Sequence, residues 1–452
     1  MADVRRAWPS VAVFFLALLP RIYTAIAWAR EPVWDGHYYD IGARSIALGR
    51  GYVGAEGGAW CHYPVGYSAL LGLAYRVFGT GSVVGPLVNA TLGALTAALL
   101  VELARHDLGE RRAALAGVLA AIYPGAIAYT PLHMTEPTAA FFLVVAACAA
   151  ARMSGVARIA VCGLALGLGT LVRPQTLLVA PAVALFVAGP TRERVRAAAL
   201  TTVLSLAVVL PWTARNCVVM DGCALVSTNG GWNLAIGAFP RATGRFETLR
   251  GSDGCTIVTG QVQQDRCWSA RAVEWIRRDP ARWLGLVPKK LGFTFDHESF
   301  PIGYLAEADP DSWPEPRRSA ARAWLSNVHR ALLSLAPLGF VARPSRRLPA
   351  TLLALVGVAL LVWVGAMSDT HPFWPLAIAT CVLPWLRPGA PRRAPTLELA
   401  SFVIATLVVV HAVFFGEDRY HLVATPFMCL LVAGALRPTE VKAPPMGSAS
   451  EP

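Results

Sequence analysis

The chain has 452 residues, of which 55% are hydrophobic and only 15% are charged, and its mean hydropathy is +0.49. A water-soluble domain averages roughly 45–50% apolar and 25% charged residues, so this composition argues against an ordinary soluble protein and indicates a membrane protein. The formal net charge of +12 is spread over short arginine-rich turns, which argues against a nucleic-acid-binding face and is typical of the positive-inside rule.

Apolar segments of near-spanning length recur along the chain and alternate with basic turns such as "ARHDLGERR" and "TRERVR". Placing those turns in the cytoplasm predicts an all-α membrane protein with about 12 transmembrane helices, roughly 11–13, plus juxtamembrane helices and one larger external loop domain of mixed structure. The predicted spans are 9–29, 82–104, 112–129, 136–152, 158–172, 175–189, 197–215, 321–340, 349–366, 371–386, 396–415 and 420–436.

The first external loop, 30–81, contains "EPVWDGHYYDIG" directly after the first apolar segment. Asp35 stands at the start of a predicted juxtamembrane helix, where the helix dipole favours an ionised carboxylate that is available as a base. The alternative is that Asp35 only caps this helix. The later segment "YSALLGLAYRVFG" is too short to cross a bilayer comfortably, so we predict a second helix lying in the interface.

The predicted organisation has four parts. Residues 1–215 form an N-terminal transmembrane catalytic module, 216–320 an external loop domain, 321–437 a C-terminal transmembrane bundle and 438–452 a disordered cytoplasmic tail. The external domain carries four cysteines, and an oxidising exterior favours disulfides among them. Three pairings are open, as are four unpaired thiols. These cysteines are Cys217, Cys223, Cys255 and Cys267.

The absence of three motifs argues against several common enzyme classes. The sequence has no Gly-rich phosphate loop, no GxSxG elbow and no HExxH motif. A nucleotide-driven pump, a serine hydrolase of the common type and a zinc protease therefore lose support. The chemistry is expected in the external loops.

Motifs in these loops occur in a familiar order. They are "YYDIGARSIALGRGY", "YPVGY", "YPGAIAYTPLHMTEPTAAFF", "TLVRPQTLLVAP" and "FFGEDRYHLVATPFMCLLVAGAL". In this order the chain resembles the GT-C glycosyltransferases of the protein-mannosyltransferase and aminoarabinose-transferase type, over roughly residues 10–436. The motifs carry no information about the sugar.

The resemblance implies a multi-pass enzyme of the bacterial inner membrane with its active site on the external, periplasmic side. Such an enzyme transfers a sugar, with inversion, from a polyprenyl-phosphate donor to a lipid, glycan or protein acceptor. The expected partners are therefore donor, acceptor and membrane lipid, with no nucleic acid. No cofactor is certain, and a divalent metal is left open, with His62 as a candidate ligand or a simple interfacial hydrogen bonder.

Sugar transfer from a lipid phosphate needs a base for the acceptor proton and cations for the departing phosphate. The predicted catalytic residues are Asp35 and Glu136. Many relatives have a second acidic residue where this chain has Gly36, and many have proline where it has Val65, so Asp40 or Glu31 would supply a second carboxylate if one is needed. The predicted substrate-binding residues are Arg419, Tyr420, Arg173, Lys289, Lys290, His62, Tyr63, Tyr67 and Arg21.

Several of these residues also have a structural explanation. Glu136 compensates a helix dipole, Arg173 snorkels to the interface, and the two lysines anchor an amphipathic stretch. An intramembrane charge such as Arg21 needs a named partner before it is assigned to a cavity, and Asp35 is the predicted partner. Two other functions compete with the enzyme: a lipid-linked sugar transporter or flippase, for which no inverted repeat is seen, and a scaffold with a disulfide-bonded external module.

Overall fold

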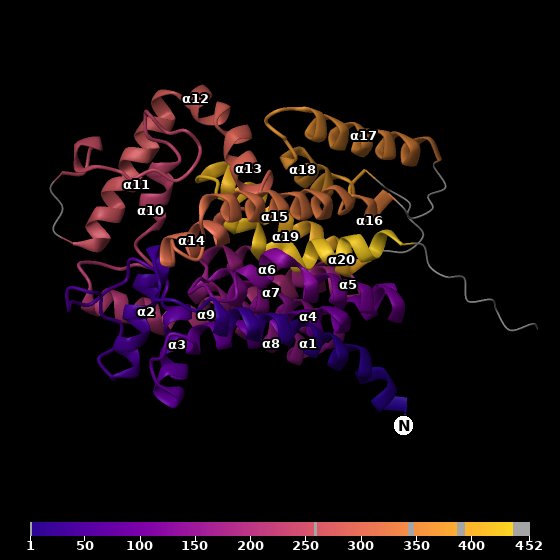
Figure 1. Cartoon of the computed structure of the whole chain (residues 1–452), viewed down its shortest axis with the longest axis horizontal. Helices are drawn as coiled ribbons and strands as arrows, with labels where there is room; N and C mark the ends of the chain where they lie inside the picture. The colour runs from indigo at the N-terminus through magenta and orange to yellow at the C-terminus, as the bar shows by residue number, and fades with distance from the viewer. Residues whose placement is uncertain (1, 257–259, 342–347, 387–393, 437–452) are drawn as a thin grey trace, which may run out of the picture.

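Helices occupy most of the chain in the computed structural model, which describes residues 2–256, 260–341, 348–386 and 394–436 (Figure 1). Within these ranges no β-strand is present, only isolated bridges. Helices suit lipid because each satisfies its own backbone hydrogen bonds. The predicted all-α fold is confirmed, and the predicted tail, 438–452, lies outside the described residues.

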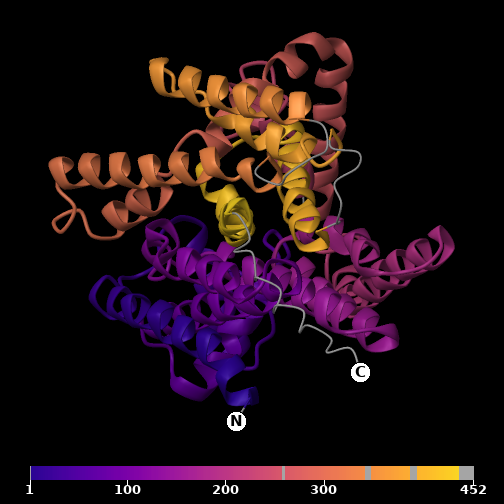
Figure 2. The ribbon, with the colours of Figure 1, turned by 90° about the vertical axis from the view of Figure 1, so that its right-hand side faces the viewer.

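Two views of the ribbon show a lower layer from the first half of the chain and an upper layer from the last third (Figures 1 and 2). The lower layer contains α1 (Ala2–Ala27), α4 (Val84–Leu108), α5 (Glu110–Ile122), α6 (Pro124–Ala128), α7 (Glu136–Arg152), α8 (Gly155–Val172) and α9 (Thr191–Val219). The upper layer contains α15 (Glu315–Leu335), α16 (Leu338–Val341), α17 (Leu348–Met367), α18 (Trp374–Val382), α19 (Pro395–Val413) and α20 (Thr425–Ala435).

The apolar helix α20 holds the two layers together. It packs against α4 and α5 below and against α15, α16 and α19 above. Its Phe427, Met428 and Leu430 are completely buried. In water, burying a side chain of this size stabilises a fold by about 1.5–3 kcal/mol. Lipid is itself apolar, so close packing between helices accounts for more of the stability here.

Five of the described helices are long and apolar enough to cross a membrane, which indicates an integral membrane protein. These are Trp8–Ala27 within α1, α4, α8, α9 and α19. The predicted number of about 12 spans is not confirmed. The span predicted at 175–189 is a 3-10 helix, η1 (Pro174–Phe186), which contains Pro181, a residue without the amide hydrogen that an α-helix needs. The span predicted at 371–386 contains only the nine-residue α18.

Two short helices form the first loop, α2 (Trp34–Ala47) and α3 (Val65–Phe78). They cross closely at Gly72, where a Cβ atom would lie 2.8 Å from Ile46 Cγ2 and 3.0 Å from the Ala43 carbonyl oxygen. Any larger residue at this position would therefore push the two helices apart. This packing fixes how α3 lies against the second half of α2, whose first turn carries Asp35.

The region predicted as an external domain of mixed structure is helical in its described part. It contains α10 (Gly230–Ile236), η2 (Gly251–Asp253), α11 (Gln261–Arg278), α12 (Pro280–Gly285), α13 (Val287–Phe295) and α14 (Phe300–Ala308). A small core of its own forms around Phe239 and Trp268 and also includes Phe415 and Tyr420 from near the end of the chain. Of the three pairings that the sequence left open, the structure contains Cys217–Cys223 and Cys255–Cys267.

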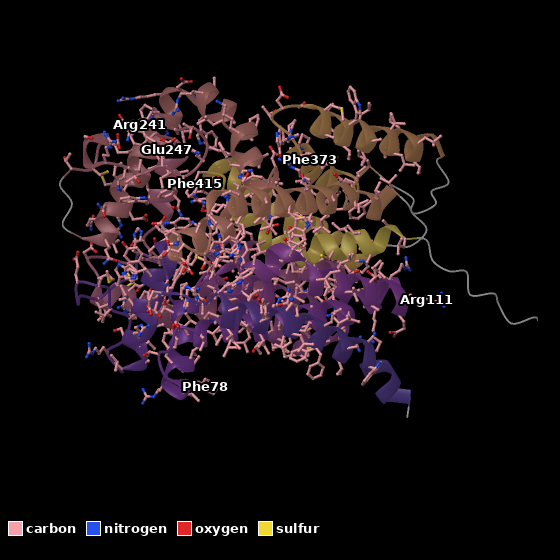
Figure 3. All side chains as sticks on the ribbon, viewed as in Figure 1. Phe78, Arg111, Arg241, Glu247, Phe373 and Phe415 are labelled. Carbon is pink, nitrogen blue, oxygen red and sulfur yellow. A yellow bond between two sulfur atoms is a disulfide. The ribbon has the colours of Figure 1, made fainter. Side chains whose placement is uncertain are left out.

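A predicted cytoplasmic turn and the predicted external segments lie at different ends of the molecule. Figure 3 places Arg111, in a basic turn of the lower layer, at the opposite end of the long axis from Arg241 and Glu247. Helix α2, whose first turn carries Asp35, and α10 to α12 lie toward the latter end (Figure 1). One predicted cytoplasmic turn and the first loop therefore lie at opposite ends of the long axis.

This separation predicts the topology. Epitope tags placed within 31–66 or 216–320 should be accessible from outside intact cells, and a tag within 190–197 should become accessible only after permeabilisation, because basic turns remain cytoplasmic. Protease digestion or antibody binding measures the accessibility of each tag in intact and in permeabilised cells. External access to 190–197 with protection of the other two segments would overturn this orientation.

Candidate active site

A cavity of about 470 Å³ lies where the first loop, the start of η1, α10 and the end of the chain meet. Its wall is contributed by segments that are hundreds of residues apart, so only the tertiary fold creates it. Six of the predicted site residues line it together: Asp35, His62, Tyr63, Arg173, Arg419 and Tyr420.

Asp35 is held at this cavity by two partners. Tyr63 donates its hydroxyl hydrogen to Asp35 Oδ1 at 2.7 Å, and Arg419 Nη1 donates to Oδ2 at 2.5 Å. Burial opposes ionisation, but the charge of Arg419 and the hydrogen bonds from Tyr63 and Arg419 outweigh it and lower the pKa of Asp35. The capping residue of α2 is Val33, so Asp35 is not the cap and its carboxylate faces the cavity instead.

Arg419 is the centre of the charge network. It lies on the 3-10 helix η3 (Asp418–Ala424), and its Nε atom is 2.5 Å from Glu417 Oε2 and 4.0 Å from Glu136 Oε1. Its guanidinium group also stacks over the rings of Phe300 and Tyr420, at 5.0 and 5.1 Å from their centroids. A planar guanidinium group suits such a position because it can stack and form ion pairs at once.

Arg173 and Glu136 form a second pair behind the first. Arg173 follows the end of α8, and its Nη1 atom donates to Glu136 Oε1 at 2.5 Å and to Thr135 Oγ1 at 3.0 Å. Glu136 is completely buried and does not line the cavity, whereas Arg173 does and also stacks over Tyr420. Glu136 therefore orients Arg173, and the snorkelling alternative for Arg173 does not describe this geometry.

The two lysines predicted to bind phosphate are not among the lining residues. Lys290 is completely buried, and its Nζ atom donates to the carbonyl oxygens of Ala412 and Val413 at 3.3 and 3.1 Å. These carbonyls end α19, so Lys290 stabilises a helix C-terminus. Lys289, its neighbour on α13, is exposed. The phosphate-binding prediction for this pair is therefore not supported by their positions.

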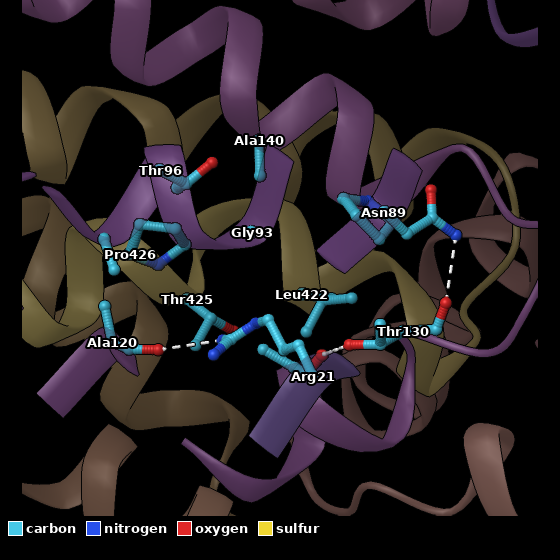
Figure 4. Close-up of a pocket in the computed structure, with 13 residues that line it drawn as sticks. Arg21, Asn89, Gly93, Thr96, Ala120, Thr130, Ala140, Leu422, Thr425 and Pro426 are labelled. Carbon is cyan, nitrogen blue, oxygen red and sulfur yellow. Dashed lines mark hydrogen bonds between the residues drawn. The ribbon is translucent and has the colours of Figure 1, made fainter. Parts of the chain in front are cut away.

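Arg21 lies in a different, smaller pocket, shown in Figure 4. Its guanidinium group donates to the carbonyl oxygens of Ala17, Ala120 and Ala121, at 2.9, 3.1 and 2.7 Å. The prediction that Asp35 is its partner is wrong. Arg21 enters the packing of α1 against α4 and α5, where backbone carbonyls satisfy it, and the carboxylate of Asp35 is taken by Arg419 instead.

Two other predictions also change. Tyr67 is completely buried and donates to Asn89 Oδ1 at 3.3 Å, so it lies in the core and not at the cavity. Asp40 accepts hydrogen bonds from Arg44 at 2.5 Å and from Tyr75 at 2.6 Å, away from Asp35, so the further carboxylates near Arg419 are Glu136 and Glu417.

Sequence reasoning missed Glu417. Burial raises its pKa to about 7, although the charge of Arg419 acts in the opposite direction. The signal was present, because an acidic residue stands two positions before the arginine of the "GEDRY" turn. The aromatic lining from Trp232, Phe246 and Phe415 was not among the predicted substrate-binding residues, although Trp232 and Phe246 stand in the aromatic-rich stretch "NGGWNLAIGAFPRATGRF" and Phe415 in the "FFGEDRYHL" motif.

Asp35, the carboxylate that lines the cavity, is already paired with Arg419, which makes the cavity a poor site for a cation in this arrangement. Among the described residues, one separate group of a carboxylate and two imidazoles has the spacing of a metal site: Glu298, His329 and His421. The predicted ligand His62 is not part of it. His62 packs edge-on against Tyr63 and Trp232 at the cavity wall.

The architecture is thus that of a helical membrane protein with an acid–arginine cavity at one end of its bundle. Residues 62–214 match the family described as dolichyl-phosphate-mannose-protein mannosyltransferase. This match confirms the predicted resemblance to GT-C glycosyltransferases over that segment. No curated protein matches the sequence.

Solved structures with a similar chain course include two enzymes. The Archaeoglobus fulgidus oligosaccharyltransferase, in complex with zinc and sulfate, is 16% identical with a TM-score of 0.47, over 94% of this chain and 48% of that one. ArnT from Cupriavidus metallidurans, bound to undecaprenyl phosphate, is 16% identical with a TM-score of 0.39, over 89% of this chain and 77% of that one. This chain spans about half the length of the oligosaccharyltransferase.

The raised pKa of Glu417 predicts a pH-dependent stability. An unfolded glutamate ionises near pH 4.3, and folded Glu417 ionises near 7, so its contribution is fully present below about pH 4 and is lost as the pH rises to about 7. Replacing it in Glu417→Gln should remove this loss, so the melting temperature of the variant relative to wild type should rise between about pH 5 and about pH 8. Differential scanning fluorimetry in detergent measures the two melting temperatures at each pH. The prediction is contradicted if the difference between the variant and the wild type stays the same across this pH range.

Proposed function

We propose that this protein is a membrane glycosyltransferase that moves a sugar from a polyprenyl-phosphate donor to an acceptor hydroxyl on the external face of the membrane, with inversion and with Asp35 as the general base. The observation that carries the proposal is the cavity itself, in which one ionised carboxylate and two guanidinium groups converge. The family matched by residues 62–214 supports the donor class, since its description names a dolichyl-phosphate sugar.

The arrangement suits a single displacement at the anomeric carbon. The acceptor oxygen forms a bond to this carbon while its proton passes to Asp35, and the bond from the carbon to the phosphate oxygen breaks. The electron pair leaves with the lipid phosphate. Arg419 and Arg173 lie at the cavity wall and would stabilise the negative charge on that phosphate. One attack from the face opposite the phosphate inverts the anomeric configuration.

The ion pair between Asp35 and Arg419 would be exchanged during this reaction. A donor phosphate competes with the carboxylates for the Arg419 guanidinium, and this frees Asp35 Oδ2 for the acceptor hydroxyl. Tyr63 still donates to Oδ1, so the carboxylate keeps its orientation. The low pKa of Asp35 makes it a weak base that is always ionised, which suits proton transfer late in a concerted step.

The remaining wall suits a sugar. Trp232, Phe246 and Tyr39 line the cavity, and aromatic faces stack on the apolar faces of pyranose rings. Asn229 and Asn233 of the same wall offer amide hydrogen bonds for hydroxyl groups. The mixture of stacking surface and neutral polar groups beside a cationic patch favours a phosphorylated sugar over a purely apolar lipid.

The base assignment predicts the behaviour of Asp35→Asn. The substitution keeps the size of the side chain and removes the proton acceptor, so turnover should fall by about 100- to 10,000-fold. Donor-lipid binding should persist, because Arg419 and Arg173 remain. The assay uses purified protein in nanodiscs with polyprenyl-phosphate sugars and an acceptor found by comparing envelope glycans of cells with and without the protein. Asp40→Asn is the matched control on the same helix and should keep its turnover; near-normal turnover of Asp35→Asn would return the interpretation to a transporter.

Arg419→Ala should instead weaken donor binding. A charge-assisted hydrogen bond contributes about 1.5–3 kcal/mol, so affinity for a polyprenyl phosphate should fall about 10- to 100-fold. Binding is measured by competition with a fluorescent polyprenyl-phosphate analogue, with melting curves to verify folding. The same loss of binding in Asp35→Asn would show that the two residues act only as a structural ion pair.

A further inference from the structure

A second cluster of chemically active side chains lies outside the cavity. Glu298 lies between α13 and α14, His329 on α15 and His421 on η3. All three are buried, with at most 1% of their surface exposed. One ligand atom from each lies within 4.8 Å of the others, although the residues are separated by 31 and 92 positions in the chain.

Hydrogen bonds fix the tautomers of both histidines. His329 Nε2 is 2.9 Å from the carbonyl oxygen of Phe295, and His421 Nδ1 is 2.8 Å from that of Thr294. A carbonyl oxygen only accepts, so each of these nitrogens carries the hydrogen. The other nitrogen of each ring then carries a lone pair. An imidazole that donates to a backbone carbonyl and keeps its second nitrogen free is the usual arrangement of a metal-binding histidine.

Two of the atoms in the cluster have no partner. Glu298 Oε1 and His421 Nε2 are buried without a hydrogen bond and lie 3.9 Å apart, too far for a direct one. The other carboxylate oxygen, Glu298 Oε2, accepts a hydrogen bond from the Tyr123 hydroxyl, so the carboxylate is held in place. A buried carboxylate oxygen and a buried lone pair facing each other are costly unless something electropositive lies between them.

We propose that Glu298, His329 and His421 bind a divalent metal ion of the zinc class. Two imidazole nitrogens and one carboxylate oxygen are a common zinc donor set, and a tetrahedral site at about 2.0–2.2 Å places ligand atoms roughly 3.3 Å apart. Glu298 Oε1 and His421 Nε2 lie 3.9 Å apart, and the three ligand atoms lie within 4.8 Å of one another. Metal binding therefore requires the cluster to close and one of the two imidazoles, which stack with ring centroids 3.7 Å apart, to rotate toward the ion. The Tyr123 hydroxyl, 3.4 Å from His329 Nδ1, or a water would complete the coordination.

The metal would join three segments that are already linked by hydrogen bonds. His421 follows Arg419 by two residues, and Glu298 precedes Ser299, whose backbone N–H donates to Asp418 on η3. A metal here would fix the turn that carries Arg419, so its role is structural and positioning. The assignment of the metal does not rest on the proposed reaction.

The test is metal content of the full-length protein, purified in detergent without chelator. Mass spectrometry of the metals should find about one zinc per chain. After removal of metal, titration with Co²⁺ alone should give the visible bands of a tetrahedral cobalt site, which Zn²⁺ then abolishes. No stoichiometric zinc and no tetrahedral Co²⁺ spectrum in the wild type would overturn the proposal and leave a bridging water or a proton in the cluster.

Variants locate the site. Glu298→Gln keeps an oxygen for Tyr123, and His421→Gln keeps a polar side chain; each should reduce Co²⁺ affinity more than about 100-fold, since even changes in supporting residues cost about 10- to 100-fold. His133→Gln is the control, because His133 is equally buried and lies outside the cluster, and it should retain the metal. A chelator should lower the melting temperature of the wild type and not of Glu298→Gln. Equal metal retention in all three variants would place the metal elsewhere.

Discussion

The ion pair between Asp35 and Arg419 joins residues 384 positions apart and connects the first loop to η3, which precedes α20. Charges at the edge of a low-dielectric interior are costly unless they are paired, so each residue limits where the other can lie. The cavity, the stacking of Tyr420 and the position of the small core around Trp268 all depend on this connection. Removing Arg419 would leave Asp35, Glu136 and Glu417 in a network in which Arg173 is the remaining guanidinium group.

In the network around this pair, the carboxylates outnumber the arginines. Three carboxylates, from Asp35, Glu136 and Glu417, face two guanidinium groups, from Arg173 and Arg419. The raised pKa of Glu417 relieves this excess, because a proton on Glu417 leaves two carboxylates opposite two arginines. In the proposed reaction, an arriving phosphate would meet an arginine held more loosely when Glu417 is protonated, which couples donor binding to pH.

The turn from residue 417 to residue 421 serves several purposes in five consecutive positions. Glu417 and Arg419 face the charge network, and Asp418 accepts hydrogen bonds from the backbone N–H groups of Ser299 and Phe300 at the start of α14. Tyr420 stacks on His411 with ring centroids 4.2 Å apart. His421 enters the cluster with Glu298. A 3-10 helix turns through about 120° per residue, so neighbouring side chains leave it in different directions. A metal at His421 and a phosphate at Arg419 would therefore act on different sides of one turn.

The sequence by itself determined the membrane class and the all-α fold, because both follow from composition and from the length of apolar segments. It also indicated Asp35, from its place at the start of a predicted juxtamembrane helix, and Arg173 and Arg419, through the motifs that resemble those of the GT-C glycosyltransferases. Only the tertiary structure decided the partners. Arg21 has the same charge as Arg419 and lies nearer to Asp35 in the chain, yet helix packing turns it toward backbone carbonyls. The burial and partners of Lys290, Glu417 and the Glu298 cluster could not be predicted for the same reason. They arise from contacts between distant segments, which local spacing does not encode.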